Sequence, residues 1–401
     1  MKYIIILADG MSDYPLEQLG GKTPLMAART PAIDRLCAQS RCGRLITVPD
    51  DMPPGSEVAN LAVLGYDVRK VYQGRGVLEA ASMGVELAEN DLAMRCNIIC
   101  IENEKIKNHS AGHISSEESL QLVQVLNERL AGPTVRFHPG VSYRHLLVIK
   151  DGKNDVECTP PHDVPGTLFA EVMPRPKGEK SATAKLLTDL IIRSQAILSA
   201  HPVNLQRKAE GKDQGNSIWP WSPGHRPRMK TFRELYGLRG AVISAVDLIF
   251  GIGVYAGLKP IKVPGATGLF NTNYEGKARA ACQALVDLDF VFLHIEASDE
   301  AGHEGNVELK VRTIEALDQR VIKPITEFTA AMKEPVTIAL LPDHATPCAV
   351  RTHTRDAVPF LIYRPGESPD SILEFNEETC RQGSYGLLQG DGFMKVLLHL
   401  D

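Results

Sequence analysis

The chain has 401 residues, of which 43% are hydrophobic and 23% charged. This composition is that of a folded protein and excludes a disordered chain, and at about 150 residues per domain the length predicts two or three domains. Forty-nine Asp plus Glu outnumber 44 Lys plus Arg, and no basic stripe carries interleaved aromatic residues, so nucleic acid is not an expected partner. No apolar run approaches the roughly 20 residues that span a bilayer, so a membrane is not an expected partner either.

Short apolar runs alternate with segments of helix length near both ends of the chain. The runs are continuous and rich in Val, Ile, Leu or Phe, as expected for strands buried on both faces of a parallel sheet. They cover residues 2–8, 291–295, 336–341 and 358–363. The segment 307–327 repeats apolar residues at helical spacing. This alternation predicts an α/β fold with a mostly parallel sheet between helices.

The stretch from residue 85 to residue 228 has a different pattern. It combines two-residue alternation, several Pro and Gly breaks, and one helix-like segment at 182–200. We interpret it as a smaller α/β domain inserted into the first. The sequence therefore predicts a core domain of residues 1–84 and 229–401 and an inserted domain of residues 85–228.

Eight cysteines are scattered along the chain without a C-x-x-C pair. The N-terminal residues enter a strand-like run directly and lack the layout of a signal peptide. Reduced, packed thiols and a cytoplasmic location are therefore expected.

Acidic and imidazole side chains occur where the predicted strands end. They are Asp9, Asp299, His303, Asp343, His344 and His353. Each alone also suits a turn, cap or surface role. Ligands of open α/β sheets, however, bind outside the carboxyl ends of the strands. Asp299 and His303 stand one helical turn apart, and an oxygen with a nitrogen ligand suits Zn²⁺ or Mn²⁺ better than Ca²⁺ or Mg²⁺. Three Asp and three His are the ligand count for two adjacent metal ions.

Ser56 follows Gly55 at the start of a predicted helix with an apolar face. Its simplest role is that of a helix cap. A more specific interpretation is that Ser56 is a nucleophile, because a helix N-terminus stabilises an incoming phosphate. A metal ion bound to Ser56 Oγ would lower the pKa of the hydroxyl and supply the alkoxide without a separate base.

Together these residues resemble the metal-site positions of the alkaline-phosphatase superfamily. More closely, the chain resembles the archaeal-type 2,3-bisphosphoglycerate-independent phosphoglycerate mutases, over nearly its whole length. Further segments that carry the resemblance are 74–76, 110–112, 140–144, 263–268 and 271–277. The resemblance implies an alkaline-phosphatase-like core, two divalent ions (Mn²⁺ or Zn²⁺) and a small phosphorylated substrate such as phosphoglycerate.

The resemblance also implies roles for single residues. It assigns one metal ion to Asp9, Ser56, Asp343 and His344, and the other to Asp299, His303 and His353. Family members work through a phosphoserine, which would be Ser56. The bound glycerate then reorients, and the phosphate returns to its other hydroxyl.

The carboxylate and phosphate of such a substrate require cationic partners. Candidates are Arg75, Arg144 and Lys277, with His109 or His113 as proton donors or phosphate ligands. His113 and Asp163 occupy places that resemble substrate-contacting positions of the wider mutase family.

Trp221 departs from the family pattern, because archaeal mutases typically carry an Arg in the corresponding segment. Arg226 and Arg228 are candidates to replace it. The tryptophan version resembles a bacterial branch proposed to act as homoserine kinases, in which the same serine would pass phosphate to an amino alcohol. The expected function is the mutase reaction. The alternatives are a homoserine-kinase-type phosphotransferase, a phosphatase, or a metal-stabilised protein without catalysis.

Overall fold

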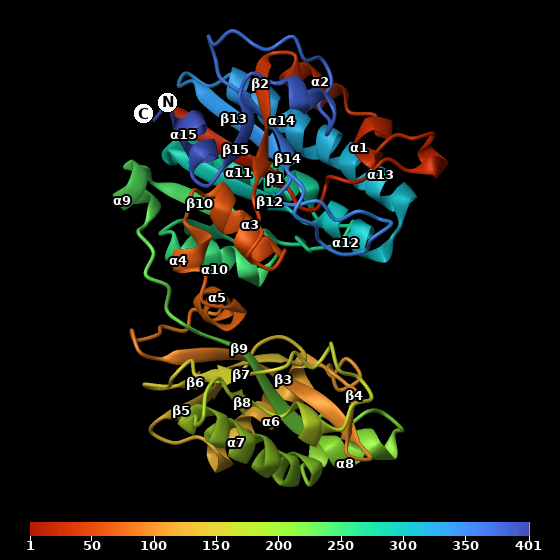
Figure 1. Ribbon diagram of the computed structural model, residues 1–401, viewed down its shortest axis with the longest axis vertical. Coiled ribbons are helices and arrows are strands. Elements are labelled where there is room, and N and C mark those ends of the chain that lie inside the picture. The colour runs from red at the N-terminus through yellow and green to blue at the C-terminus, as the bar shows by residue number, and fades with distance from the viewer. Residues whose placement is uncertain (401) are drawn as a thin grey trace. The chain divides into compact units, whose positions relative to one another are not determined.

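The computed structural model describes residues 1–400, which form two compact units (Figure 1). We call Met1–Tyr72 and the chain from Met229 onward the core unit, and Gln73–Arg228 the insert unit. The contacts place the first boundary at residue 72 instead of the predicted residue 84. The reason is helix α5 (Arg75–Ser82), which packs on strands of the insert unit. Gly76 permits this packing, because an added Cβ there would lie 2.7 Å from Met94 Cα.

The core unit contains an eight-stranded sheet in the order β11-β10-β12-β1-β13-β14-β2-β15. The bounds are β1 (Lys2–Ala8), β2 (Ser40–Ile46), β10 (Gly240–Ile243), β11 (Lys259–Ile261), β12 (Phe290–Ile295), β13 (Val336–Leu341), β14 (Val358–Tyr363) and β15 (Gly386–Gln389). β14 runs antiparallel to β13 and β2, and the other pairs are parallel. The mostly parallel α/β sheet is confirmed. The parallel direction expected for residues 358–363 is wrong, because burial on both faces does not set the direction of a strand.

Helices cover both faces of this sheet (Figure 1). The helices of the core unit are α1 (Pro24–Ala27), α2 (Pro31–Cys37), α3 (Ser56–Val63), α4 (Val68–Val71), α9 (Phe232–Tyr236), α10 (Asp247–Tyr255), α11 (Tyr274–Asp287), α12 (Ala297–Glu304), α13 (Val307–Leu317), α14 (Lys323–Ala330) and α15 (Gly392–Leu398). A π-helical turn, Asp318–Ile322, joins α13 to α14 within the predicted helix 307–327. One apolar cluster unites α2, α11, α13 and α14 with alternate residues of β1, such as Ile4 and Ile6.

The insert unit contains an antiparallel sheet of β3 (Leu92–Glu102), β4 (Lys105–Asn108), β5 (Val135–His138), β6 (Arg144–Ile149) and β9 (Ser217–His225). β7 (Val156–Glu157) and β8 (Arg175–Pro176) form a separate pair. Its other helices are α6 (Ser116–Arg129), α7 (Ala182–Ser199) and α8 (Pro202–Ala209). An apolar cluster of its own includes Phe137, Leu187 and Trp219, so each unit has a separate core.

Within residues 1–400, no helix combines the length and the apolarity needed to cross a membrane.

Candidate active site

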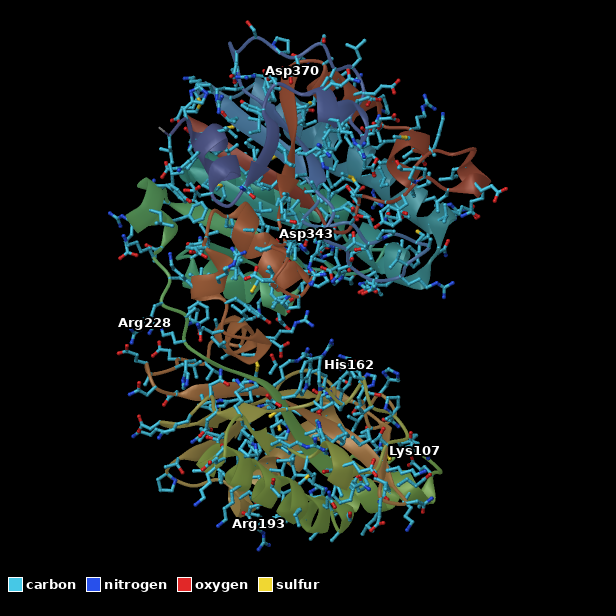
Figure 2. All side chains as sticks on the ribbon, in the orientation of Figure 1. Lys107, His162, Arg193, Arg228, Asp343 and Asp370 are labelled. Atoms are coloured by element: carbon cyan, nitrogen blue, oxygen red, sulfur yellow. The ribbon has the colours of Figure 1, made fainter. Side chains whose placement is uncertain are left out.

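Three neighbouring parallel strands of the core unit deliver polar residues to one edge of the sheet. β1 lies between β12 and β13. Asp9 follows β1, Asp343 and His344 follow β13, and α12, which comes directly after β12, carries Asp299 and His303. Figure 2 shows Asp343 inside the core unit. Because parallel strands end at the same edge, residues far apart in the sequence meet there.

The first group of candidate ligands comprises Asp9, Asp343 and His344, whose ligand atoms lie within 4.8 Å of one another. Asp343 Oδ1 accepts hydrogen bonds from the backbone N–H groups of Gly10 (3.2 Å) and His344 (2.9 Å), and Oδ2 accepts one from Asn60 Nδ2 (2.8 Å). Asp9 Oδ1 is buried and has no hydrogen-bond partner. Burial and the neighbouring Asp343 carboxylate raise the pKa of Asp9.

Ser56 lies against this group. It is the first residue of α3, its exposed fraction is 8%, and Ser56 Oγ is 3.1 Å from His344 Nε2. Thr346 Oγ1 donates to Asp299 Oδ1 and lies 3.2 Å from His344 Nδ1. Since the Thr346 proton is used on Asp299, His344 Nδ1 is the donor to Thr346. His344 Nε2 therefore presents its lone pair toward Ser56.

The second group comprises Asp299, His344 and His353, again with ligand atoms within 4.8 Å of one another. His303 adjoins it, with Nε2 2.9 Å from His353 Nε2 and 3.2 Å from Asp299 Oδ2. The hydrogen bond to Asp299 raises the pKa of His303 to about 9. Burial acts to raise the pKa of Asp299, but the His303 and His353 imidazoles outweigh it and the pKa is lowered.

These side chains fit divalent metal ions. The Asp9 carboxylate oxygen that has no hydrogen-bond partner lacks what a cation would supply. The His303 and His353 Nε2 atoms lie 2.9 Å apart beside the Asp299 carboxylate, so both imidazoles are placed to bind one ion. Nitrogen and oxygen donors of this kind suit Zn²⁺ and Mn²⁺. The structure brings together all seven residues predicted for the metal site, and His344 lies within reach of both groups.

Sequence reasoning missed several buried polar residues that hold the predicted ligands. They are Asn60, His294 and Thr346, and Ser244, also buried, bonds to His294. Asn60 had a usable signal, because it stands one helical turn after Ser56. His294 lies within an apolar strand, and that context favours an ordinary core residue.

Five predicted substrate residues belong to the insert unit, and most of them are exposed. His113, Arg144 and Asp163 are exposed, whereas Arg75 and His109 are half-buried. Lys277, in the core unit, is different: its exposed fraction is 0%, and its Nζ donates to the carbonyl of His294 at 3.3 Å. The role of Lys277 in substrate binding stays a prediction. Burial also lowers the pKa of Lys277 to about 8.

Trp221 is part of a cationic and aromatic cluster in the insert unit. The Arg95 guanidinium lies 4.5 Å from the centre of the Trp221 ring, and Trp221 Nε1 donates to Asn97 Oδ1 at 3.0 Å. Arg95 and Trp221 pair directly across β3 and β9. The His162 ring packs edge-on against Trp221, and Figure 2 shows His162 on the insert unit. Arg95, and neither Arg226 nor Arg228, therefore supplies the cation beside this tryptophan.

This fold and this set of side chains define an α/β enzyme in which one serine lies among candidate metal ligands. A family model described as 2,3-bisphosphoglycerate-independent phosphoglycerate mutase matches residues 37–204. A relative of that name from Methanosarcina acetivorans is 52% identical over 400 residues, covering 99% of this chain and 100% of the relative. A probable enzyme of that name from Geobacter sulfurreducens is 47% identical over 409 residues, covering 100% of both.

Solved structures agree with this result. The PH0037 protein of Pyrococcus horikoshii has a TM-score of 0.84 at 30% identity, covering 100% of this chain and 98% of that one. The cofactor-independent phosphoglycerate mutase of Thermoplasma acidophilum has a TM-score of 0.71 at 26% identity and covers 100% of both chains. The chain belongs to the 2,3-bisphosphoglycerate-independent phosphoglycerate mutase family, and the resemblance found in the sequence is confirmed.

Proposed function

We propose that the protein interconverts 2-phosphoglycerate and 3-phosphoglycerate by passing the phosphoryl group through Ser56. The observation that supports this most directly is the 3.1 Å distance between Ser56 Oγ and His344 Nε2, within a buried cluster of carboxylates and imidazoles. Relatives that share its whole length and about half of its residues are named for this activity.

Ser56 acts as the nucleophile. Its Oγ forms a bond to phosphorus while the bond from phosphorus to the glycerate oxygen breaks, and that oxygen takes up the proton that Ser56 loses. The reverse transfer delivers the phosphoryl group to the other glycerate hydroxyl and returns the proton to Ser56. The position of Ser56 at the start of α3 favours the negative charge of the phosphate.

Two divalent cations, Mn²⁺ or Zn²⁺, would be held at this site. When bound, such ions stabilise the charge of a transferring phosphoryl group and lower the pKa of a hydroxyl beside them. Asp9, Ser56, Asp343 and His344 would hold one ion, and Asp299, His303 and His353 the other. Asn60 and Thr346 keep these ligands in place through their hydrogen bonds to Asp343 and Asp299.

The insert unit supplies cations for the carboxylate or phosphate of the substrate. Burial lowers the pKa of Arg95, partly opposed by Glu79, and the positive charges of Arg75 and Arg144 lower it further. Arg95 Nε pairs with Glu79 Oε1 at 3.0 Å, and three guanidinium groups beside this carboxylate favour an anion nearby. His109 and His162 adjoin this cluster with rings 5.9 Å apart, and we include Arg95 and His162 with the predicted Arg75, Arg144, His109, His113 and Asp163.

The products formed from defined substrates test this proposal. With Mn²⁺ present, 31P NMR should show conversion of 3-phosphoglycerate to 2-phosphoglycerate without any nucleotide. Phosphorylation of homoserine with ATP would favour the kinase alternative, and release of inorganic phosphate as the main product would favour a phosphatase. Ser56→Ala should abolish turnover. The matched control is Ser40→Ala, which removes another buried hydroxyl of the core unit, bonded to the Leu36 carbonyl.

A further inference from the structure

Three buried side chains form a hydrogen-bonded row across adjacent strands of the core unit. β10, β12 and β1 are neighbours in the sheet. Ser244 follows β10, His294 lies in β12 and Asp9 follows β1. All three residues are buried, with exposed fractions of 1% for Ser244 and 0% for His294 and Asp9. His294 stands in the middle, with Nδ1 3.2 Å from Ser244 Oγ and Nε2 2.8 Å from Asp9 Oδ2.

The donors and acceptors give this row one direction. His294 Nε2 faces Asp9 Oδ2 and, at 3.7 Å, Glu296 Oε2. An Asp9 carboxylate that holds a cation is ionised and only accepts hydrogen bonds, so Nε2 is then the nitrogen that carries the proton. In a neutral imidazole Nδ1 then has the lone pair, and Ser244 Oγ donates to it. Ser244 Oγ in turn accepts from the backbone N–H of Val246 at 3.0 Å.

The row determines which oxygen of Asp9 is free. Oδ2 is engaged by His294, whereas Oδ1 is buried without a partner and lies 3.6 Å from His344 Nε2. We propose that His294, oriented by Ser244, is a positioning residue that fixes the Asp9 carboxylate so that Oδ1 is presented to a cation of the first ligand group. This inference rests on the metal-binding role proposed above. Groups that orient metal ligands in this way typically change metal affinity when they are removed.

A cation bound by His294 itself is the competing arrangement. Asp9, His294 and Glu296 also place ligand atoms within 4.8 Å of one another. The nitrogen that would bind the ion, Nε2, already carries the proton donated to Asp9. The Lys277 ammonium, which donates to the His294 carbonyl, adds a positive charge to the same neighbourhood. The positioning role therefore fits these groups better than a third metal ion.

Titration of the metal-free full chain with Mn²⁺, followed by calorimetry, tests the inference. Wild type should bind two Mn²⁺. His294→Leu should weaken one of the two sites by about 10- to 100-fold and leave the other unchanged. His294→Gln keeps an N–H donor at the position of Nε2 and should recover most of the affinity. Ser244→Ala should weaken the same site several-fold, and Ser40→Ala, the buried-serine control, should change neither site.

A second measurement needs no destabilising variant. Long-range 1H–15N NMR of the wild-type chain loaded with diamagnetic Zn²⁺ should show His294 with its proton on Nε2, and Ser244→Ala should reduce the population of that tautomer. A proton on Nδ1 in the wild type would overturn the inference.

Unchanged Mn²⁺ affinity in His294→Leu and Ser244→Ala would also overturn the inference. Equal losses of Mn²⁺ affinity in His294→Leu and His294→Gln would overturn it too, and so would a third bound Mn²⁺ that His294→Leu removes. In each of these cases the proposed function would stand. Failure of the wild-type chain to bind Mn²⁺ would overturn the proposed function and this inference with it.

Discussion

The hydroxyl of Thr346 connects the two ligand groups, so its removal should affect both. Thr346 is fully buried, and its Oγ1 donates to Asp299 Oδ1 and accepts from His344 Nδ1. Thr346→Val keeps the shape of the side chain and removes only this oxygen. Asp299 Oδ1 then loses the Thr346 donor, and either nitrogen of His344 can carry the proton.

The size of the effect follows from the two lost hydrogen bonds. A hydrogen bond to a charged group contributes about 1.5–3 kcal/mol and a neutral one about 0.5–1.5 kcal/mol. The free energy of unfolding of the metal-free core unit should therefore fall by about 2–4.5 kcal/mol. Because Asp299 and His344 lose their orientation, Mn²⁺ affinity should fall by about tenfold or more at both sites, in contrast to the single site affected by His294→Leu.

Urea unfolding of the metal-free protein and Mn²⁺ calorimetry measure these two effects. Thr346→Ser should retain most of both properties. The control is Thr313→Val, because Thr313 is also buried but its Oγ1 donates only to the Lys310 carbonyl of its own helix. Wild-type Mn²⁺ affinity at both sites in Thr346→Val would refute the reasoning, and so would a loss confined to one site.

Three further results are expected. Arg95→Met should raise the KM for 3-phosphoglycerate about tenfold or more with a smaller change in kcat. The control Arg193→Met, which removes an exposed cation of α7 (Figure 2), should change neither constant. An unaltered KM in Arg95→Met would exclude Arg95 from substrate binding. Chelation of divalent ions should abolish turnover, added Mn²⁺ should restore it, and full activity of a metal-free preparation would contradict the metal assignment. Burial lowers the pKa of His145 to about 4, below the value of about 6.5 in an unfolded chain. Between pH 4 and pH 6.5 the unfolded state therefore binds more protons than the folded state. The insert unit should lose about 3 kcal/mol of stability as the pH falls from 6.5 to 4. His145→Leu should flatten this slope in urea unfolding, and an unchanged slope would show that other groups cause it.

The candidate metal ligands could be predicted from the sequence because their placement depends on a general property of parallel sheets. Asp9, Asp343 and His344 each follow a continuous apolar run, and such runs end at one edge of the sheet. Asp299 and His303 could be paired from their spacing alone, since α12 places them one turn apart.

The residues that hold those ligands depend on which strands are neighbours. His294 is a positioning candidate only because β12 lies between β10 and β1, which no local pattern reveals. The contact of Arg95 with Trp221 likewise depends on the register of β3 and β9. The antiparallel direction of β14 depends on the connection that precedes it. Local composition determines which segments are buried, but pairing and register arise from the packing of the whole unit.

The most direct test of the phosphoserine claim is to locate the phosphate during turnover. The protein would be mixed with 3-phosphoglycerate and Mn²⁺, quenched in acid within milliseconds, digested, and analysed by mass spectrometry. A phosphorylated peptide with the modification on Ser56 should form and decay within one turnover, in the wild type and in Ser40→Ala. Phosphate on a different residue, or undiminished product formation by Ser56→Ala, would contradict the account.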